Sequence, residues 1–446
     1  MINAAVIQAY DVRGIYPTEL NDETVAALAR AYAAWLKPKT VVLGRDVRES
    51  SPHLWQVAAD ALTAAGVNVI DIGVISTDML YYAVPTLKAD GGITVTASHN
   101  PREYNGMKMV REQAIPISSD SGLQEIASML GDAVPAPAAV PGRVSKADIR
   151  AGYLEHVLSF IDKSSLKPLN VVINGNFGLA AQLIQEALTD SPIKFIPLND
   201  QPDGTFPKGR PDPLIPENRT ETEELVRRSK ADLAIAWDAD ADRCFFFDEQ
   251  GEFVDGYYMT TILAELMLKK SPGSAVIYDP RQIWAIEKRV AELGGRAVIN
   301  KAGHTFIKEA MRREDAVFGG ETSAHYYFRD NFYCDNGLIP ALLVLEHLSQ
   351  TGQKLSEVVR PLREQYFISG EVNTKVEDTL ATLARVEQQF ADGEITKIDG
   401  LSVAYPDWRF NVRASNTEPT IRLNVEAKSQ ALCDEKTAVI LDIIKS

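Results

Sequence analysis

Hydrophobic and polar positions alternate between helical and strand spacing through most of the chain. Residues 22–36 have the apolar spacing of an amphipathic helix, and the apolar run at 40–44 is typical of a short buried strand. Ser51 and Pro52 suggest an N-cap and a first-turn proline, so a second helix is expected from there to about residue 65, before a strand at 67–71. This strand–helix–strand order predicts α/β layers.

Residues 131–148 are rich in proline and alanine and lack periodicity, so they are expected to be a linker. Alternation restarts after it, with expected helices at 149–162 and near 179–189, and expected strands at 170–174, 231–238, 244–248, 274–279 and 296–300. The C-terminal part differs, because residues 408–414 and 421–427 alternate strictly, as half-buried antiparallel strands do, and a helix follows from about Ser429.

The predicted fold class is therefore three consecutive α/β domains with mixed sheets, followed by a smaller C-terminal α+β domain. The boundaries expected for these domains are 1–145, 146–255, 256–366 and 367–446.

Composition changes this picture little. The 446 residues are 45% hydrophobic and 24% charged, an ordinary globular balance. The net charge of −15 argues against a nucleic-acid surface. No run approaches the roughly 18 apolar residues of a membrane helix, and the N-terminal residues do not have the pattern of a signal peptide. Cys244, Cys334 and Cys433 are too far apart for a disulfide framework, so a reducing, cytoplasmic location is expected.

The first candidate for chemistry is the segment TASHNP, which follows the expected strand GGITVT directly. A serine at a strand end, here Ser98, is held rigidly while its hydroxyl faces outward. His99 and Lys108 can supply proton transfer and charge stabilisation. A polar turn with a surface serine is an equally open interpretation of this segment alone.

The second candidate places Asp238, Asp240 and Asp242 at alternate positions before Arg243. Three carboxylates in a tight loop can converge on one Mg²⁺, and the arginine can contact a phosphate on that metal. An EF-hand loop also begins this way, but its sixth position needs a glycine and is Arg243 here. A solvated acidic turn is the remaining alternative.

Two further loops offer groups for recognition. Glu321 and Ser323 present an acceptor and a donor that suit neighbouring sugar hydroxyls, and His325 can assist or contact phosphate, although a plain strand-end loop is the other interpretation. The loop from Arg413 through Thr417 can form an anion site, or can be an ordinary hairpin turn. The short pieces YDVRG, GRDVR and KAGH are weak in isolation.

Taken together and in this order, the segments resemble the α-D-phosphohexomutase family. The likeness runs nearly end to end, from Tyr10 to the segment around Thr417. Within the family the chain is most similar to bacterial phosphomannomutases, some of which also act on glucose phosphates. This finer likeness lies in the segments AWDADADRCFFFD, GGETSAHYYFRD and DWRFNVRASNTEP.

The resemblance implies an isomerase that interconverts hexose 6-phosphate and hexose 1-phosphate, with mannose expected first and glucose as a further or main substrate. It implies four domains around a central cleft, Mg²⁺, a phosphoserine, and hexose 1,6-bisphosphate as intermediate and activator. Small phosphosugars are the expected partners, with neither nucleic acid nor membrane, and a monomer or weak dimer is expected.

Residue by residue, the resemblance implies four sets of site residues. They are catalytic Ser98, His99, Lys108, Arg13 and His304; metal-binding Ser98, Asp238, Asp240 and Asp242; substrate-binding Arg243, Arg281, Lys301, Glu321, Ser323 and His325; and phosphate-binding Arg413, Ser415, Asn416 and Thr417.

The chain departs from the family pattern in the metal loop, where Ala239 and Ala241 replace glycine. If the first of these positions needs a positive φ, Ala239 is strained by about 1 kcal/mol. This departure leaves open one rival, a non-catalytic sugar-phosphate-binding protein. A second rival is a metal-dependent phosphatase, which differs from a mutase in whether water enters the cleft.

Overall fold

The computed structural model describes residues 2–8, 11–131, 137–414 and 419–446. It divides into two compact units, Met1–Phe253 with His325–Leu355, and Val254–Ala324 with Ser356–Ser446. No helix within the described ranges is long and apolar enough to cross a membrane. Short 3₁₀ or π turns lie at Ala4–Val6, Glu112–Ala114, Ser119–Leu123, Lys163–Ser165, Pro216–Asn218 and Arg329–Asn331.

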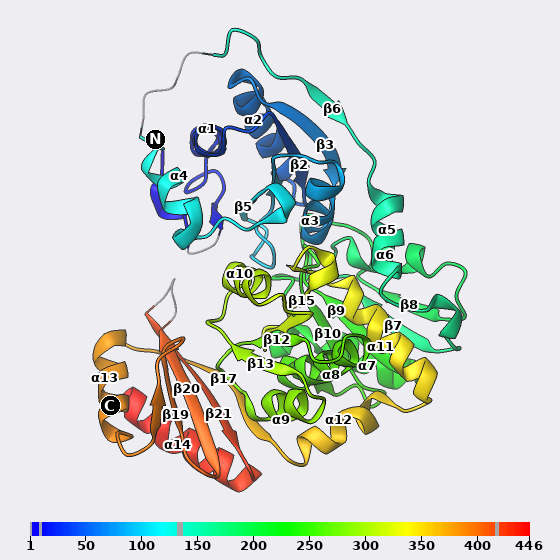
Figure 1. The fold of residues 1–446 in the computed structure, drawn as a ribbon, viewed down its shortest axis with the longest axis vertical. Coiled ribbons are helices and arrows are strands. Elements are labelled where there is room, and N and C mark those ends of the chain that lie inside the picture. Colours follow the sequence, from blue (N-terminus) through cyan, green and yellow to red (C-terminus); the bar gives the residue numbers. More distant parts are fainter. Residues whose placement is uncertain (1, 9–10, 132–136, 415–418) are drawn as a thin grey trace. The chain divides into compact units, whose positions relative to one another are not determined.

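The first unit begins with a mixed sheet, drawn in blue to cyan in Figure 1. Its strand order is β1 (Val12–Ile15), β5 (Tyr104–Arg111), β4 (Gly91–Val95), β2 (Thr40–Arg45), β3 (Asn68–Val74) and β6 (Val144–Lys146). β5 is antiparallel to β1 and β4, whereas the other pairs are parallel. The helices of this part are α1 (Asp22–Leu36), α2 (Ser51–Ala64), α3 (Thr77–Thr86) and α4 (Gln124–Ser128). Buried apolar side chains from α1, α2 and the strands form one core.

Two local predictions in this part need correction. Ser51 is not the N-cap of α2, because Ser50 holds that position without a side-chain cap, and the Ser51 hydroxyl instead donates to Asp46 Oδ1 at 2.5 Å. The expected linker at 131–148 also contributes a strand, because β6 pairs with β3 although all its residues are exposed.

The first unit continues with a second sheet in the order β11 (Phe253–Val254), β10 (Cys244–Phe247), β9 (Leu233–Trp237), β7 (Asn170–Asn174) and β8 (Lys194–Leu198). β7 is parallel to β8 and β9, and β10 is antiparallel to β9. The helices are α5 (Arg150–Leu158), α6 (Ala180–Ala187), α7 (Thr220–Ser229) and α11 (Leu338–Thr351). The antiparallel pair β15 (Tyr326–Phe328) and β16 (Cys334–Asp335) completes the unit.

The second unit begins with three parallel strands in the order β13 (Arg296–Ile299), β12 (Ala275–Tyr278) and β14 (Phe318–Gly320). Its helices here are α8 (Gly256–Lys270), α9 (Trp284–Glu292), α10 (His304–Glu314) and α12 (Leu355–Arg363).

The second unit ends with an antiparallel sheet, drawn in orange and red in Figure 1. Its order is β17 (Phe367–Lys375), β21 (Thr420–Ala427), β20 (Trp408–Ala414), β19 (Leu401–Ala404) and β18 (Glu394–Thr396). Trp408, Phe410 and Val412 face a core shared with α13 (Thr379–Gln389) and α14 (Gln430–Lys445). The intervening polar residues therefore share the other face. The predicted class of successive α/β domains with mixed sheets and a smaller C-terminal domain is confirmed.

Candidate active site

Ser98 lies in the turn that follows β4 and is buried, with 2% of its surface exposed. Its backbone has a φ of +50°, a conformation that costs a non-glycine residue free energy and that clusters at functional sites. The backbone N–H donates to Thr96 Oγ1 at 2.9 Å. The hydroxyl donates to Asp238 Oδ2 at 3.1 Å and lies 3.0 Å from His99 Nδ1. The turn thus aims the serine oxygen at the acidic loop.

The side chain of Arg48 holds this turn by hydrogen bonds to the backbone of the turn. It is 1% exposed, and its guanidinium donates to the carbonyl oxygens of Ser98 (2.6 Å), Asn100 (2.7 Å), Pro101 (2.8 Å) and Tyr104 (3.1 Å). Its Nε donates to Asp46 Oδ2 at 3.1 Å. In the sequence GRDVR is only a weak motif and predicts no role for Arg48, since the carbonyl partners of Arg48 lie 50 to 56 positions away.

Asp238, Asp240 and Asp242 lie in the loop between β9 and β10, and each is at most 1% exposed. One oxygen from each lies within 4.8 Å of one from the others. Asp240 Oδ1 is buried and accepts no hydrogen bond from the described residues. Three carboxylates with a buried oxygen left to coordinate fit a hard divalent cation such as Mg²⁺. The cluster can therefore hold a metal.

Cations neutralise this cluster unevenly. Lys108 Nζ lies 2.7 Å from Asp240 Oδ2 and 2.5 Å from Asp242 Oδ2. Burial acts to raise the pKa of both aspartates. The Lys108 charge, together with hydrogen bonds at Asp240 and with His325 and Arg243 at Asp242, outweighs burial, so both pKa values are lowered. Burial raises the pKa of Asp238 above its ordinary value, against the opposing charge of Arg243.

The acidic loop is supported by close backbone packing. Ala241, not Ala239, has the positive φ, at +58°, so the strain expected at Ala239 is placed two residues too early. A Cβ on Gly337 would lie 2.4 Å from the carbonyl oxygen of Ala241, and one on Gly178 would lie 2.2 Å from that of Ala239. Thr77 N–H donates to the Asp240 carbonyl at 2.8 Å. The loop is held from neighbouring segments of the same unit.

Two arginines and a neutral histidine lie near the serine turn: Arg243, Arg13 and His99. Arg243 Nε donates to Asp238 Oδ2 at 3.1 Å, and its Nη2 contacts His99 Nδ1. Burial, Arg243 and Arg13 lower the pKa of His99, so its ring is neutral at neutral pH. Arg13 Nη1 donates to Asn100 Oδ1 at 2.7 Å.

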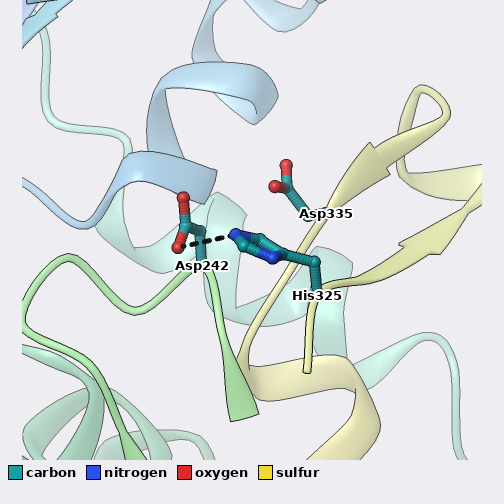
Figure 2. Close-up of side chains that lie close together, drawn as sticks. All are labelled: Asp242, His325 and Asp335. Carbon is teal, nitrogen blue, oxygen red and sulfur yellow. Dashed lines mark ion pairs between the residues drawn. The ribbon is translucent and has the colours of Figure 1, made fainter. Parts of the chain in front are cut away.

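His325 lies beside the acidic loop, with Nε2 3.5 Å from Asp242 Oδ1, as the dashed line in Figure 2 marks. Figure 2 also shows Asp335, from β16, close to the same imidazole ring. Asp242, His325 and Asp335 each offer a ligand atom within 4.8 Å of the others. Sequence reasoning missed Asp335, because nothing in its local sequence distinguishes it from other strand carboxylates.

The second unit holds the remaining expected residues. Glu321 is 3% exposed and its Oε1 accepts from Gly303 N–H at 2.8 Å. His304 starts α10, with Nδ1 3.4 Å from Lys308 Nζ. Lys301 Nζ lies 3.5 Å from the ring centre of Phe306. Ser323 is partly buried in the turn after β14.

Arg281 and Arg413 each meet carboxylates in this unit. Arg281 Nε and Nη2 donate to Asp279 at 2.8 Å each, and Nη2 lies 3.6 Å from Glu321 Oε1. Arg413, at the end of β20, donates to Glu371 Oε2 at 3.2 Å. The expected phosphate-binding residues Ser415, Asn416 and Thr417 lie outside the described residues.

Comparisons with known proteins agree with this arrangement. Models of phosphoglucomutase/phosphomannomutase domains I, II, III and IV match residues 5–133, 151–251, 255–366 and 371–442. A phosphomannomutase of Salmonella montevideo is 46% identical over the whole of both chains, and a phosphohexose mutase of Xanthomonas campestris pv. campestris is 46% identical over 98% of each. A crystal structure of a phosphoglucomutase/phosphomannomutase family protein from Burkholderia thailandensis has a TM-score of 0.89 at 29% identity, covering 100% of this chain and 98% of that one.

The fold, the site and these relatives define the class of protein as a phosphohexomutase, an isomerase that relocates a phosphoryl group on a sugar. The chain belongs to the phosphoglucomutase/phosphomannomutase family.

Proposed function

We propose that the chain interconverts mannose 6-phosphate and mannose 1-phosphate, with glucose phosphates as further substrates, through a phosphoserine at Ser98 and a hexose 1,6-bisphosphate. The observation that carries the proposal is the buried contact of 3.1 Å between Ser98 Oγ and Asp238 Oδ2. Relatives named phosphomannomutase, 46% identical over the full chain, support mannose as the preferred sugar.

The transfer requires a bond from phosphorus to a sugar oxygen to form as the bond from Ser98 Oγ to phosphorus breaks. Asp238, Asp240 and Asp242 would hold Mg²⁺, which neutralises phosphoryl charge when bound. Neutral His99, 3.0 Å from Ser98 Oγ, is suited to move a proton at that oxygen. A second transfer, with the bisphosphate turned around, returns a phosphoryl group to Ser98.

Residues of the second unit would supply recognition of the sugar and of the phosphate that does not react. Glu321 and Ser323 are assigned to the sugar hydroxyls, which must be read in both orientations. Arg413, with Ser415, Asn416 and Thr417, is assigned to the distal phosphate. Arg281 donates two hydrogen bonds to Asp279, so its proposed contact with substrate is the least direct of the set.

The domain boundaries 1–145, 146–255, 256–366 and 367–446 are also retained as a proposal, supported by the near-coincident family matches. A cytoplasmic location is proposed as well, because Cys244, Cys334 and Cys433 are free and buried.

The deciding experiment is a coupled assay with mannose 1-phosphate or glucose 1-phosphate and a trace of glucose 1,6-bisphosphate. We expect turnover of both, with the larger kcat/KM for mannose. Ser98→Ala should remain folded and bind sugar phosphate but lose turnover, since only the transferring oxygen is removed. Near wild-type rates in Ser98→Ala would refute the phosphoserine, and binding without turnover in the wild type would favour a sugar-phosphate-binding protein.

A further inference from the structure

A carboxylate in the C-terminal sheet meets three arginines that come from different parts of the second unit. Glu371 Oε2 accepts from Arg413 Nη2 at 3.2 Å and Oε1 accepts from Arg422 Nη1 at 3.3 Å. Arg281 Nη1 lies 3.8 Å from Oε2. Burial acts to raise the pKa of Glu371, but the three guanidinium groups outweigh it and lower the pKa, so the side chain is ionised at neutral pH.

A β-bulge places Glu371 among these arginines. The pairing of β17 with β21 shifts by one residue between Ile368 and Glu371, where Gly370 has a φ of +68°. After the shift Glu371 lies opposite Asn424, on the polar face, whereas regular pairing would put it opposite Leu423, on the core face. Bulges of this kind re-aim a side chain near functional sites.

The arginines need such a partner. Arg413 and Arg422 lie directly opposite each other on β20 and β21, and like charges in that arrangement repel. The Glu371 carboxylate offers one oxygen to each guanidinium and so holds the pair together. The side chain of Arg413 is only 15% exposed, and its buried Nε donates no hydrogen bond to the described residues. Glu371 thus holds Nη2 of the guanidinium, while Nη1 lies 3.9 Å from Asp399 Oδ2.

Arg281 lies between Glu371 and Glu321, the glutamate proposed to bind the sugar hydroxyls. Its guanidinium is bound by Asp279, whose Oδ2 also accepts from Thr322 N–H at 3.0 Å, and it lies 3.6 Å from Glu321. Glu371 therefore links Arg281 to Arg413 in a chain of contacts that begins at Glu321, all within one compact unit.

We propose that Glu371 is a positioning residue that pre-orients Arg413 for the distal phosphate of the sugar. This inference rests on the proposed function of Arg413. A long arginine side chain loses rotamer freedom when it binds, so a carboxylate that fixes it beforehand improves affinity. Glu371 touches no reacting atom in this scheme, and its removal affects binding rather than the transfer step.

The test is Glu371→Gln in the full chain, with Glu394→Gln as the control. Glu394 is an exposed carboxylate on β18 of the same sheet, so its substitution makes the same change in charge. Steady-state kinetics with mannose 1-phosphate should show KM about tenfold higher in Glu371→Gln, or about 1.4 kcal/mol, with kcat within about twofold. Calorimetric titration with mannose 1-phosphate should show the same tenfold rise in Kd, and the control should change neither.

A double-mutant cycle shows whether Glu371 acts through Arg413. In an Arg413→Ala background, Glu371→Gln should change KM by less than about twofold, because the residue it positions is gone. A full tenfold effect in that background would overturn the proposal, as would an effect on kcat alone or behaviour equal to Glu394→Gln. If Glu371→Gln fails to fold, Glu371→Asp, which retracts the charge by one methylene, should raise KM in the same way.

Failure of the proposed function is separable from failure of this inference. A wild-type chain without turnover refutes the mutase proposal, yet the titrations with mannose 1-phosphate still compare Glu371→Gln with its control. A wild-type chain that binds no sugar phosphate overturns both.

Discussion

Asp78, in the first turn of α3, is a completely buried carboxyl group whose titration should contribute to the pH dependence of stability in the first unit. The Ser76 hydroxyl donates to one of its oxygens, and Tyr153 OH donates to the other at 2.6 Å. Burial raises the pKa of Asp78 to about 7, the two hydroxyl donors oppose this, and the charges of Asp242 and Asp335 add to it.

The magnitude follows from the pKa difference between the folded and unfolded states. The ordinary value of 3.8 applies to the unfolded chain, and about 7 applies to the folded one. Between these two pH values the folded state binds more protons than the unfolded state. The stabilisation contributed by protonated Asp78 is therefore fully present below pH ~4 and is lost as the pH rises through ~7. A shift of roughly three units corresponds to about 4 kcal/mol. Above pH ~7 the loss is complete and the contribution is flat.

Asp78→Asn tests this reasoning, because the amide resembles the protonated carboxyl group and does not titrate. We expect the variant to have similar stability to the wild type near pH 4.5 and to exceed it by about 3–4 kcal/mol near pH 8. The measurement is urea unfolding followed by circular dichroism at a series of pH values in EDTA, with Asp60→Asn, an exposed carboxyl on α2, as the control. A constant difference between Asp78→Asn and the wild type across this range would refute the raised pKa.

Two further predictions concern the reaction centre. EDTA should abolish turnover and Mg²⁺ should restore it, while Asp240→Asn should need far more Mg²⁺ for half-maximal activity; turnover that persists in EDTA would exclude a metal role for the loop. Arg48→Lys keeps the charge but cannot donate to four carbonyl groups. We therefore expect kcat to fall about 10- to 100-fold, or about 1.4–2.7 kcal/mol, with KM for mannose 1-phosphate little changed. An unchanged kcat would show that the turn does not depend on Arg48.

Local signals in the sequence were enough to predict many elements of the fold. The apolar spacing predicts the helix at 22–36 to the residue, and in the structure Asn21 caps it by accepting from Thr24 N–H. The strand at 408–414 was also predicted to the residue from its alternation, but it is not half-buried as expected, because the polar Arg409 and Asn411 are buried as well as the apolar residues. β6 could not be predicted in this way, since its three exposed residues become a strand only by pairing with β3. Ser51 misled for a similar reason, because Asp46 binds its hydroxyl.

Residues of the candidate site also differ in whether the local sequence is enough to recognise them. Ser98 and the three aspartates lie where buried strands end, and such positions can be recognised from pattern and motif. Arg48 and Glu371 act through partners distant in sequence, and a charged residue at a strand edge looks ordinary until those partners are known. Glu371 was further hidden by the bulge, because regular alternation of β17 would have placed it on the opposite face.

The position of backbone strain connects these observations to function. Ser98 and Ala241 both have positive φ, at +50° and +58°, and each such residue costs on the order of 1 kcal/mol or more. Arg48 fixes the serine turn through carbonyl oxygens, which any sequence offers, so the cost is offset without restricting the reactive side chains. Gly337 leaves room for the Ala241 carbonyl oxygen, because a Cβ at that position would lie 2.4 Å from it. The strain of Ala241 itself remains, since it arises between its own Cβ and its backbone, and the packing of neighbouring segments has to offset it. The chain thus departs from the family pattern in this loop while Asp238 stays in contact with Ser98 and Lys108 binds Asp240 and Asp242.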